Sequence, residues 1–375
     1  MKEHIIAVGG AGYIGSHVVR ELLDAGHKVT VFDNLSTGLR SNVPAEAGFV
    51  QGDIRDGAAL ASVLGPAVAA ARDGGAGEPV VIHLAALKAA GESMGQPETY
   101  AEHNIAGTIS LLNATTEAGI TKLVFSSSAA VYGEPQYQPV DEQHPTEPAN
   151  FYGYTKLAIE QLLGWYFRLR GLASVSLRYF NAAGYDPAGR VYGLERNPAN
   201  LLPVIMEVAA GLRPGLQVFG DDYPTEDGTG VRDYVHVSDL AQAHLLAVKR
   251  LRANSECIAV NLGSESGISV AAMLASARRI TGREIASTLA PRRAGDPASL
   301  VASSTLARTL LAWQPTRSDA DTLVATTWAA YRKSAPAAAG PIAATPAPAA
   351  AAGPSAATRP GSPQSGGRQP RGPEA

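Results

Sequence analysis

The sequence predicts an α/β fold, in which a doubly wound parallel (Rossmann) sheet is followed by a smaller α+β substrate domain. Two observations support this prediction. Strand-like and helix-like segments alternate from residue 4 to about residue 180. After residue 181, short helices are separated by irregular loops and short strands. Alternation of the first kind is typical of parallel sheets covered by helices on both faces, which bind ligands beyond the carboxyl ends of their strands.

The chain begins with a predicted strand, turn and helix. Residues 4–8 are apolar and rich in β-branched side chains, as in a buried parallel strand. Glycines follow at 9, 12 and 15, and apolar residues then recur at helical spacing up to residue 23. Gly9 permits the tight turn, Gly12 lets the backbone approach a pyrophosphate, and Gly15 lets the helix pack closely on the strand. This arrangement predicts a dinucleotide site at a helix N-terminus.

The second predicted strand, residues 28–32, ends in Asp33. A carboxylate at this position can accept both ribose hydroxyls of an adenosine and repels a 2′-phosphate, so we expect NAD rather than NADP. Asp53 follows the strand at 49–51 and is expected to lie near the adenine ring. The alternative for Asp33 is a turn or helix-capping acid in Asp-Asn-Leu-Ser.

The rest of the first domain repeats the pattern. Predicted strands lie at 80–84, 122–125 and 174–178, and predicted helices at 98–118 and 152–170. The loops after residues 8, 32, 84, 125 and 178 should therefore line one cleft.

Two groups of residues at this cleft suggest proton transfer. Ser126-Ser127-Ser128 follows a predicted strand, and Tyr152 and Lys156 lie four residues apart on a predicted helix. Residues at this spacing share a helix face. A neighbouring ammonium stabilises the phenolate and lowers the tyrosine pKa, so the tyrosine can exchange a proton with a sugar alcohol. The alternative is a pair on the helix surface without a catalytic role.

Composition limits the other functions. The chain has 375 residues, 45% of them hydrophobic and 17% charged, with a net charge of −3. This balance does not favour nucleic-acid binding. The single Cys257 excludes an internal disulfide and a cysteine-rich metal site, and we expect no metal. No apolar run is long enough to span a membrane, and the first residues form a strand, so we expect a cytoplasmic protein without a membrane partner.

We divide the chain into three parts: residues 1–181, 182–333 and 334–375. The first binds NAD and carries the catalytic residues, and the second binds the substrate. In the second part we expect helices at 200–211, 238–251, 269–280 and 318–333, and crossings back to the first domain. The last part is rich in Ala, Pro, Gly and Ser and lacks aromatic residues, so we expect disorder.

The predicted helix at 152–170 is apolar around most of its circumference. Such a helix is buried on more than one side. We therefore expect a homodimer in which this helix and the helix at 98–118 meet a second copy. The alternative is burial by C-terminal segments of the same chain.

Several motifs together resemble one family. They are Gly-Gly-Ala-Gly-Tyr-Ile-Gly-Ser-His (9–17), Asp-Asn-Leu-Ser-Thr-Gly (33–38), Ser-Ser-Ser-Ala-Ala-Val-Tyr-Gly (126–133), Tyr-Gly-Tyr-Thr-Lys (152–156), Arg-Tyr-Phe-Asn (178–181) and the long block at 222–237. Between residues 4 and about 333, the chain closely resembles the UDP-glucose 4-epimerase family of extended short-chain dehydrogenases/reductases. The resemblance implies a tightly held NAD, Tyr152 as the base at the sugar 4-hydroxyl, Ser128 as its hydrogen-bonding partner, and Lys156 as a ligand of the nicotinamide ribose.

The resemblance also implies further binding residues. The cofactor residues would be Gly9, Gly12, Tyr13, Ile14, Gly15, Asp33, Asn34, Asp53, Ile54, Lys88, Asn104, Tyr152, Lys156 and Tyr179. The substrate residues would be Ser128, Asn181, Asn200, Phe219, Arg232, Arg293 and Asp296. Phe219 would lie against the uracil, Arg232 and Arg293 would bind the diphosphate, and Asp296 would bind the uridine ribose. As alternatives, Lys88 is an exposed loop charge, and Arg232 forms a salt bridge with Asp233 or Asp239.

Two positions depart from the family pattern. Val8 replaces a common threonine, so the glycine turn loses a local hydrogen bond, but we expect NAD binding to be retained. Leu300 stands where some members have a tyrosine beside the 2-position of the sugar. Because leucine is smaller, we hypothesise that UDP-N-acetylhexosamines are also accepted.

The leading interpretation is therefore an NAD-dependent isomerase that interconverts UDP-galactose and UDP-glucose. The nearest alternative is a 4-epimerase of UDP-pentoses or UDP-glucuronate. A nucleotide-sugar 4,6-dehydratase is disfavoured, because Ala129-Ala130-Val131 after Ser128 offers no acid and base pair. A non-catalytic NAD-sensing protein is disfavoured by the presence of both Tyr152 and Lys156.

Overall fold

The computed structural model describes residues 2–73, 77–195, 198–293 and 296–334. The described residues up to Ser334 form one compact unit. Of the tail that we expected from residue 334 onward, residues 335–375 lie outside the described residues, and Ser334 is the last residue of a helix.

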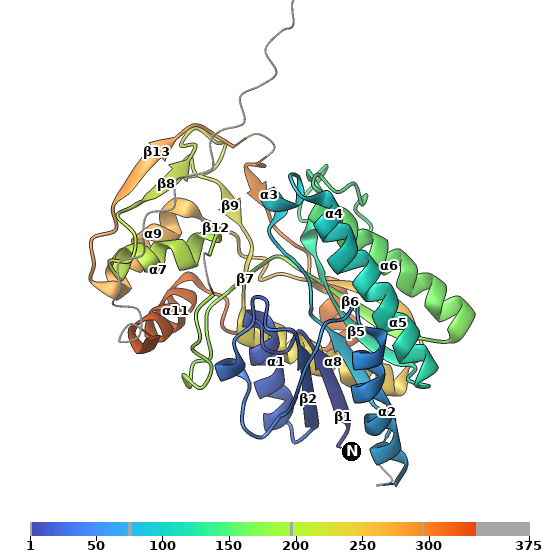
Figure 1. The fold of residues 1–375 in the computed structure, drawn as a ribbon. Helices are drawn as coiled ribbons and strands as arrows, with labels where there is room; N and C mark the ends of the chain where they lie inside the picture. The colour runs from blue at the N-terminus through green and yellow to red at the C-terminus, as the bar shows by residue number, and fades with distance from the viewer. Residues whose placement is uncertain (1, 74–76, 196–197, 294–295, 335–375) are drawn as a thin grey trace, which may run out of the picture. The chain divides into compact units, whose positions relative to one another are not determined.

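The centre of this unit is a seven-stranded parallel sheet (Figure 1). Its strands are β1 (His4–Val8), β2 (Lys28–Asp33), β3 (Gly48–Gln51), β4 (Val80–His83), β5 (Lys122–Ser128), β6 (Ala173–Tyr179) and β11 (Cys257–Leu262), in the order β11-β6-β5-β4-β1-β2-β3. The doubly wound parallel sheet that the sequence predicts is confirmed. The direction of winding reverses between β1 and β4, which is where such sheets bind ligands.

Alternate residues of each strand enter two different cores. Ile5 and Ala7 of β1 face the core that contains α1 (Tyr13–Asp24) and α8 (Val237–Ala253). Ile6 and Val8 face the core on the other side, with α2 (Gly57–Asp73), α5 (Gly107–Glu117) and α6 (Phe151–Arg170). Because both faces are buried, the strands read as continuous apolar runs in the sequence.

Further elements connect these layers. They are η1 (Arg40–Asn42), α3 (Ala90–Ser93), α4 (Pro97–Tyr100), η2 (Ala101–Ala106) and η3 (Ala129–Val131). The helix predicted at 98–118 is divided into α4, the π-helix η2 and α5. Strand β5 runs on to Ser128, so the three serines belong to the strand and do not follow it.

The C-terminal part forms a separate core. Its helices are α7 (Leu201–Ala209), α9 (Val270–Thr281) and α11 (Ala320–Ser334), and its strands are β7 (Asn181–Ala183), β8 (Leu216–Phe219), β9 (Val231–Arg232), β10 (Tyr234–His236), β12 (Ile268–Ser269), β13 (Ser287–Ala290) and β14 (Ser299–Leu300). Helix α10 (Thr305–Leu311) packs instead on α8 and β11, in the core of the large sheet. Residues of α7, α9 and α11 pack together in one apolar cluster. The strands pair as β7 with β10, β8 with β13, and β9 between β12 and β14.

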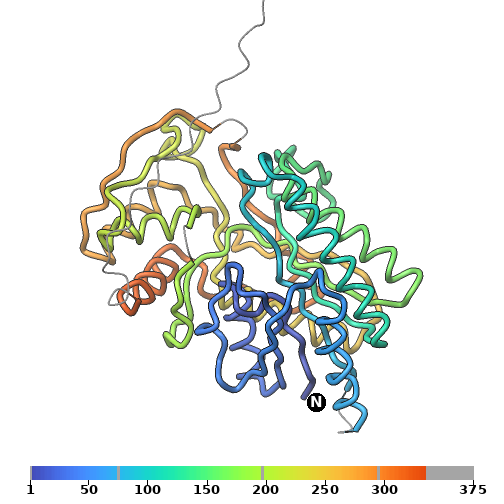
Figure 2. The backbone as a smooth tube through the Cα atoms, in the orientation of Figure 1, coloured from blue at the N-terminus to red at the C-terminus, as the bar shows by residue number. Residues whose placement is uncertain are grey.

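The chain does not remain in the C-terminal part after β7. Figure 2 follows it back to the large sheet, where α8 packs on α1 and β11 pairs with β6. The boundary that we placed at residue 181 stays a prediction.

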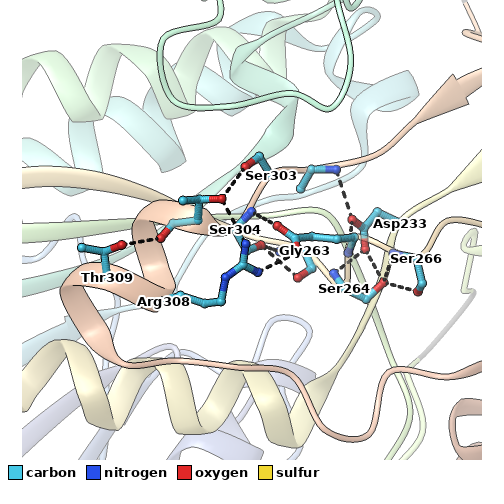
Figure 3. A network of polar contacts seen from close by, with 11 residues as sticks. Asp233, Gly263, Ser264, Ser266, Ser303, Ser304, Arg308 and Thr309 are labelled. Carbon is cyan, nitrogen blue, oxygen red and sulfur yellow. Dashed lines mark hydrogen bonds and ion pairs between the residues drawn. The ribbon is translucent and has the colours of Figure 1, made fainter.

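A buried carboxylate joins these returning segments. Asp233 is fully buried between β9 and β10. One of its oxygens accepts hydrogen bonds from the amide and hydroxyl of Ser264, and the other accepts from the amides of Glu265 and Ala302. Figure 3 shows this network and its continuation: the Glu265 carboxylate accepts from the Ser304 amide and from Arg308, and the Ser304 hydroxyl bonds to Gly263. A carboxylate that accepts several such bonds fixes the loops around it. The backbone on either side of Asp233 is therefore held in place.

No described helix is long and apolar enough to cross a membrane. In the same part of the chain, no group of three or more His, Cys, Asp or Glu residues is arranged to hold a metal ion.

Candidate active site

The glycine turn after β1 requires residues without side chains. Gly9 has φ +84°, and its amide donates to the Phe32 carbonyl at 2.8 Å. A Cβ atom on Gly9 would lie 2.5 Å from the Ala85 nitrogen, and one on Gly15 would collide with the Gly9 carbonyl oxygen. The close packing that we predicted for Gly15 is therefore visible in the structure.

The first turn of α1 can receive an anion. Gly12 is the N-cap residue, and no side chain caps the helix. The amides of the next residues, which include Tyr13 and Ile14, have no intrahelical acceptors because they lie in the first turn. A Cβ on Gly12 would approach only the Gly9 oxygen, at 3.4 Å, so the space in front of this turn is open. These features fit the pyrophosphate of a dinucleotide.

Asp33 is the last residue of β2 and is nearly buried. Its carboxylate accepts hydrogen bonds from the amides of Ala11, at 2.9 Å, and Leu35, at 2.8 Å. The first bond ties Asp33 to the glycine turn, and the second agrees with the turn role that we considered as an alternative. Because a carboxylate has about four acceptor sites, ribose hydroxyls can still be bound.

The adjacent acidic residue has protein partners of its own. Asp53 accepts from Asn34 at 3.0 Å and from two guanidinium nitrogens of Arg55, each at 2.9 Å. The hydrogen bonds from Arg55 hold the pKa of Asp53 well below its ordinary value. Ile54 lies so close to α5 that a Cβ on Gly107 would be 2.7 Å from its side chain.

Tyr13 joins the glycine turn to the second half of the chain. Its hydroxyl donates to the Gly184 carbonyl, and its ring lies 5.2 Å from that of Tyr185. Lys88 forms an ion pair with Glu195, and its Nζ lies 6.0 Å from the centre of the Tyr13 ring. The Lys88 side chain is 56% exposed, so the structure also agrees with the alternative interpretation of this lysine as an exposed loop charge.

Asn104 lies in the π-helix η2 and is fully buried. Its oxygen accepts from the Leu87 amide at 2.9 Å. Its nitrogen donates to the Leu87 carbonyl at 3.0 Å and to the Thr155 hydroxyl at 3.1 Å. Both N–H groups are thus used within the protein, and the residue joins the loop after β4 to helix α6.

Tyr152 and Lys156 face the end of β5 from the first turns of α6. The N-cap residue Asn150 accepts from the Gly153 amide at 2.9 Å and so starts the helix at this point. The Tyr152 phenol lies close enough to the Ser128 hydroxyl for this serine to lower the tyrosine pKa. Lys156 donates to the Ser126 carbonyl at 2.9 Å, and its Nζ lies 5.7 Å from the centre of the Tyr152 ring. The structure therefore brings the predicted catalytic residues together.

Burial controls the electrostatics of these residues. It raises the pKa of Tyr152, and the Ser128 hydroxyl opposes this rise. Burial also lowers the pKa of Lys156 to about 7, against the effect of Glu160. We expected the Lys156 ammonium to make the tyrosine more acidic. In the structure the pKa of Tyr152 is raised, because removing the phenol from water penalises its charged form, and the effect of Lys156 by itself stays a prediction.

The other two serines support the strand end. The Ser126 hydroxyl lies 2.9 Å from Nε2 of His244 and is also hydrogen-bonded to Tyr179. Burial raises the pKa of Tyr179, the last residue of β6. The Ser127 hydroxyl donates to Glu160 at 2.5 Å. We did not single out Glu160 from the sequence, although it follows Lys156 by one helical turn on the same face.

The proposed substrate residues lie in the C-terminal part, where two of the charged ones pair. Arg232 donates to Asp296 at 2.5 Å. The alternative partners that we considered for Arg232 are engaged elsewhere: Asp233 binds the loops described above, and Asp239 bonds to Arg317. A salt bridge does form, but its acidic partner comes from a distant part of the sequence.

The remaining substrate residues have separate positions. The guanidinium carbon of Arg293 lies 3.9 Å from the centre of the Phe219 ring, so the arginine covers one face of the ring. Asn181, in β7, donates to the Asp233 carbonyl at 3.0 Å. Asn200 is the N-cap residue of α7, and its side chain does not cap that helix. Its amide is therefore not used by the helix that it begins.

Fold and site together define a class. A doubly wound sheet with an uncapped glycine turn, an acid after β2, and Ser, Tyr and Lys at the switch point is the arrangement of an NAD-dependent short-chain dehydrogenase/reductase.

Comparison with known proteins gives the family. Residues 5–263 match the NAD dependent epimerase/dehydratase family. The chain is 49% identical to UDP-glucose 4-epimerase of Lacticaseibacillus casei, over 86% of this chain and 95% of that protein. The crystal structure of UDP-glucose 4-epimerase from Brucella ovis in complex with NAD has a TM-score of 0.82 and 41% identity, covering 87% of this chain and 98% of that one. The UDP-glucose 4-epimerase of Bifidobacterium longum, solved with NAD+ and UDP, has a TM-score of 0.78 and 34% identity, covering 88% and 98%.

The chain therefore belongs to the NAD dependent epimerase/dehydratase family and, within it, to the UDP-glucose 4-epimerases, which are NAD-dependent isomerases.

The packing of the glycine turn gives a first prediction. Gly15→Ala places a methyl group against the Gly9 carbonyl, so we expect NAD binding to weaken by about 1–3 kcal/mol, the usual cost of overpacking. NAD released from the purified protein by denaturation, and its melting temperature, measure the effect. Gly164→Ala in α6 is the control, because its Cβ would meet only the Arg168 side chain at 3.9 Å. Full NAD content in Gly15→Ala would contradict the assignment.

Proposed function

We propose that this protein interconverts UDP-galactose and UDP-glucose by inverting C4 of the sugar through a 4-keto intermediate. The observation that supports this activity most directly is the joint position of Tyr152, Ser128 and Lys156 at the carboxyl end of β5. The glycine turn and Asp33 lie at the carboxyl ends of β1 and β2 in the same sheet. A hydride acceptor and a proton acceptor can thus approach one substrate carbon from the same crevice.

The glycine turn and Asp33 would hold NAD, which would supply the hydride chemistry at C4 of the sugar, first as acceptor and then as donor. The residues of the chain handle the proton. Tyr152 takes the proton of the 4-hydroxyl, and the Ser128 hydroxyl, which lies beside the tyrosine, can bind the same sugar oxygen. Lys156 is held behind the tyrosine by the Ser126 carbonyl. Because burial makes Tyr152 a weaker acid, a positive charge next to it is needed for the phenolate to form near neutral pH.

The remaining binding residues are proposed from their positions. Gly9, Gly12, Tyr13, Ile14 and Gly15 would hold the pyrophosphate. The rest of the cofactor set, Asp33, Asn34, Asp53, Ile54, Lys88, Asn104 and Tyr179, would line the adenosine and nicotinamide ends. Asn104 would act through the loop it supports, since its N–H groups are occupied.

The substrate would lie between the two halves of the chain. Phe219 would meet the uracil with the ring face that Arg293 leaves free. Arg232 and Arg293 would bind the diphosphate, and Asp296 the uridine ribose. Asn181 and Asn200 would complete the contacts. In this assignment, Arg232 and Asp296 hold each other in place through their ion pair before substrate binds.

A position beside the sugar favours a wider substrate range. Leu300 in β14 pairs in register with Arg232 of β9 and packs on the cluster that contains Phe180 and Tyr132. We propose that its small side chain leaves room for the acetamido group of UDP-N-acetylhexosamines. The alternative substrates, UDP-pentoses and UDP-glucuronate, can be tested by measuring the epimerised product formed from each.

We also propose a homodimer. Helices α4, α5 and α6 lie side by side on one face of the sheet (Figure 1). On α6, Tyr154, Trp165 and Leu169 are 51%, 54% and 69% exposed, so this chain leaves an apolar strip of the helix uncovered. Burial by C-terminal segments of the same chain, the alternative that we considered, does not cover these side chains in the described residues. A second copy would cover them. The cytoplasmic location stays a prediction.

Loss of the phenol tests the base. Tyr152→Phe removes the proton acceptor but keeps the ring, so we expect kcat to fall by about 10²–10⁴-fold while NAD stays bound. A coupled assay for UDP-glucose formed from UDP-galactose measures turnover, without added NAD. Tyr154→Phe, on the exposed side of the same helix, should retain full activity. Undiminished turnover in Tyr152→Phe would show that another residue is the base.

The role of Leu300 predicts a change in specificity. We expect the wild-type protein to epimerise UDP-N-acetylgalactosamine, and Leu300→Tyr to lower kcat/KM for this substrate by about tenfold or more, since the larger ring fills the proposed space. Activity on UDP-galactose should change little. The same product assay with both sugars decides the matter, and absence of wild-type activity on the acetylated sugar would remove the hypothesis.

The dimer can be tested by sedimentation. We expect the wild-type protein to sediment as a dimer and Trp165→Glu/Leu169→Glu as a monomer, because charges are costly at a buried interface. The control is Leu289→Glu, which alters a side chain of β13 that is 59% exposed and lies in the C-terminal part. A monomeric wild-type protein would exclude the interface.

A further inference from the structure

Strand β5 and helix α6 meet through a series of polar contacts. The serines of 126–128 each meet a different turn of the helix. Tyr152 lies beside the last serine, Lys156 donates to the carbonyl of the first at 2.9 Å, and Glu160 accepts from the hydroxyl of the middle one at 2.5 Å. The three helix residues are spaced four apart, so they follow one face of α6. Two of them belong to the proposed catalytic machinery, and Glu160 does not.

Glu160 is also half of a buried ion pair. Arg178 of β6 donates through Nε at 2.9 Å and through Nη2 at 2.5 Å to the two oxygens of the carboxylate. Both side chains are 9% exposed. Arg178 is the register partner of Ser127 in the neighbouring strand, so the carboxylate binds two strands at once. Such two-pronged contacts fix geometry as well as charge.

The far side of the guanidinium is held as well. Nη1 of Arg178 donates to the Tyr132 hydroxyl at 2.9 Å, and that hydroxyl donates to Asn261 of β11 at 2.7 Å. The arginine therefore cannot leave Glu160 without breaking bonds to other elements. Because the Glu160 carboxylate is anchored in this way, it fixes the position of the preceding turn of α6, which carries Lys156.

We propose that Glu160, anchored by Arg178 and Ser127, is a positioning residue for the reaction: it holds the Tyr152 and Lys156 face of α6 against the end of β5, and its negative charge favours the ammonium form of Lys156. This inference rests on the proposed function of Tyr152 and Lys156. Glu160 touches neither substrate nor cofactor in this role.

The charges around Lys156 agree with the second part of the proposal. Its own helix presents Tyr152 and Glu160, and β4 presents His83. Burial lowers the pKa of His83 to about 3, so this imidazole is neutral near pH 7. On the far side of β5, Tyr179 and His244 bond to the Ser126 hydroxyl, and the pKa of His244 is lowered to about 4 by burial.

The sign of the pH effect follows from these groups. Burial already lowers the pKa of Lys156 to about 7, and Glu160 counteracts it. Without the carboxylate, the pKa of the lysine falls further, so the ammonium is lost at a lower pH. Since the phenolate of Tyr152 depends on nearby positive charge, the loss of activity on the alkaline side should then begin at a lower pH.

Glu160→Gln tests the proposal in the full-length, NAD-containing protein. We expect kcat with UDP-galactose to fall about ten- to a hundredfold near pH 8, as for a small misplacement of catalytic groups. KM and the amount of bound NAD should change by less than about twofold. The alkaline limb of the kcat profile should move to lower pH by about one unit, the size of a typical charge effect.

Tyr132→Phe is the matched control. It removes the bond at the other end of Arg178 and leaves the Glu160 carboxylate in place. We expect a lower melting temperature but an unchanged pH profile. If Glu160→Gln lowers the melting temperature but leaves the pH profile unchanged, as expected for Tyr132→Phe, then the role of Glu160 is structural and the proposal is overturned.

A second readout does not depend on turnover. The absorbance change on tyrosine ionisation, taken as the difference between each protein and its Tyr152→Phe derivative, reports Tyr152 alone. In the NAD-containing proteins we expect this tyrosine to ionise at higher pH in Glu160→Gln than in the wild type, because the lysine charge that is lost lies 5.7 Å from the Tyr152 ring and the carboxylate charge that is removed lies two helical turns away. Equal ionisation in both would overturn the electrostatic part of the proposal.

Ser127→Ala keeps the ion pair between Glu160 and Arg178. It tests the positioning role even if Glu160→Gln does not fold. We expect a fall in kcat of about fivefold or more with an unshifted pH profile, because only the positioning contact is lost. Unchanged kcat would overturn the positioning role. A wild-type protein inactive on every UDP-sugar would instead refute the proposed function, which separates the two failures.

Discussion

The contact between the start of α6 and the end of β5 is the constraint on which the site depends. Gly153 allows this contact, because a Cβ at that position would collide with the Ala130 carbonyl oxygen. Lys156 then reaches the Ser126 carbonyl, and Tyr152 reaches Ser128. Without so close an approach, neither side chain would face the crevice at the carboxyl ends of the strands, and the helix would be an ordinary cover of the sheet.

The doubly wound sheet brings the other half of the chemistry to the same place. The glycine turn follows β1, the serines end β5, and β4 lies between these two strands. Because all these strands are parallel, their carboxyl ends share one edge. The second half of the chain is joined to this edge through Tyr13 and Gly184, and through β11, which pairs with β6. Arg232, which we propose as a substrate residue, is in turn held by the neighbouring Asp233 and its bonds to returning loops.

Desolvation both protects and limits the catalytic groups. Burial makes the ammonium of Lys156 a stronger acid and the phenol of Tyr152 a weaker acid. The protein alone therefore shifts both pKa values away from the ammonium and phenolate pair that the proposed reaction needs. Charges in a buried site also interact more strongly than they would in water. Glu160 and the positive nicotinamide ring can therefore influence Lys156 and Tyr152. The burial of Tyr152 therefore makes its phenolate depend on the positive charge of bound NAD.

The sequence by itself determined the local parts of this protein. Glycine spacing, the acid after the second strand, and the four-residue step from Tyr152 to Lys156 depend on neighbours in the chain, so the fold class could be predicted directly and the catalytic residues could be proposed. Tertiary structure alone decided which distant groups meet. It selected Asp296 over Asp233 and Asp239 as the partner of Arg232, joined Glu160 to Arg178, and set the direction of the Tyr152 pKa. These outcomes depend on burial and on contacts between residues far apart in sequence, which spacing along the chain does not encode.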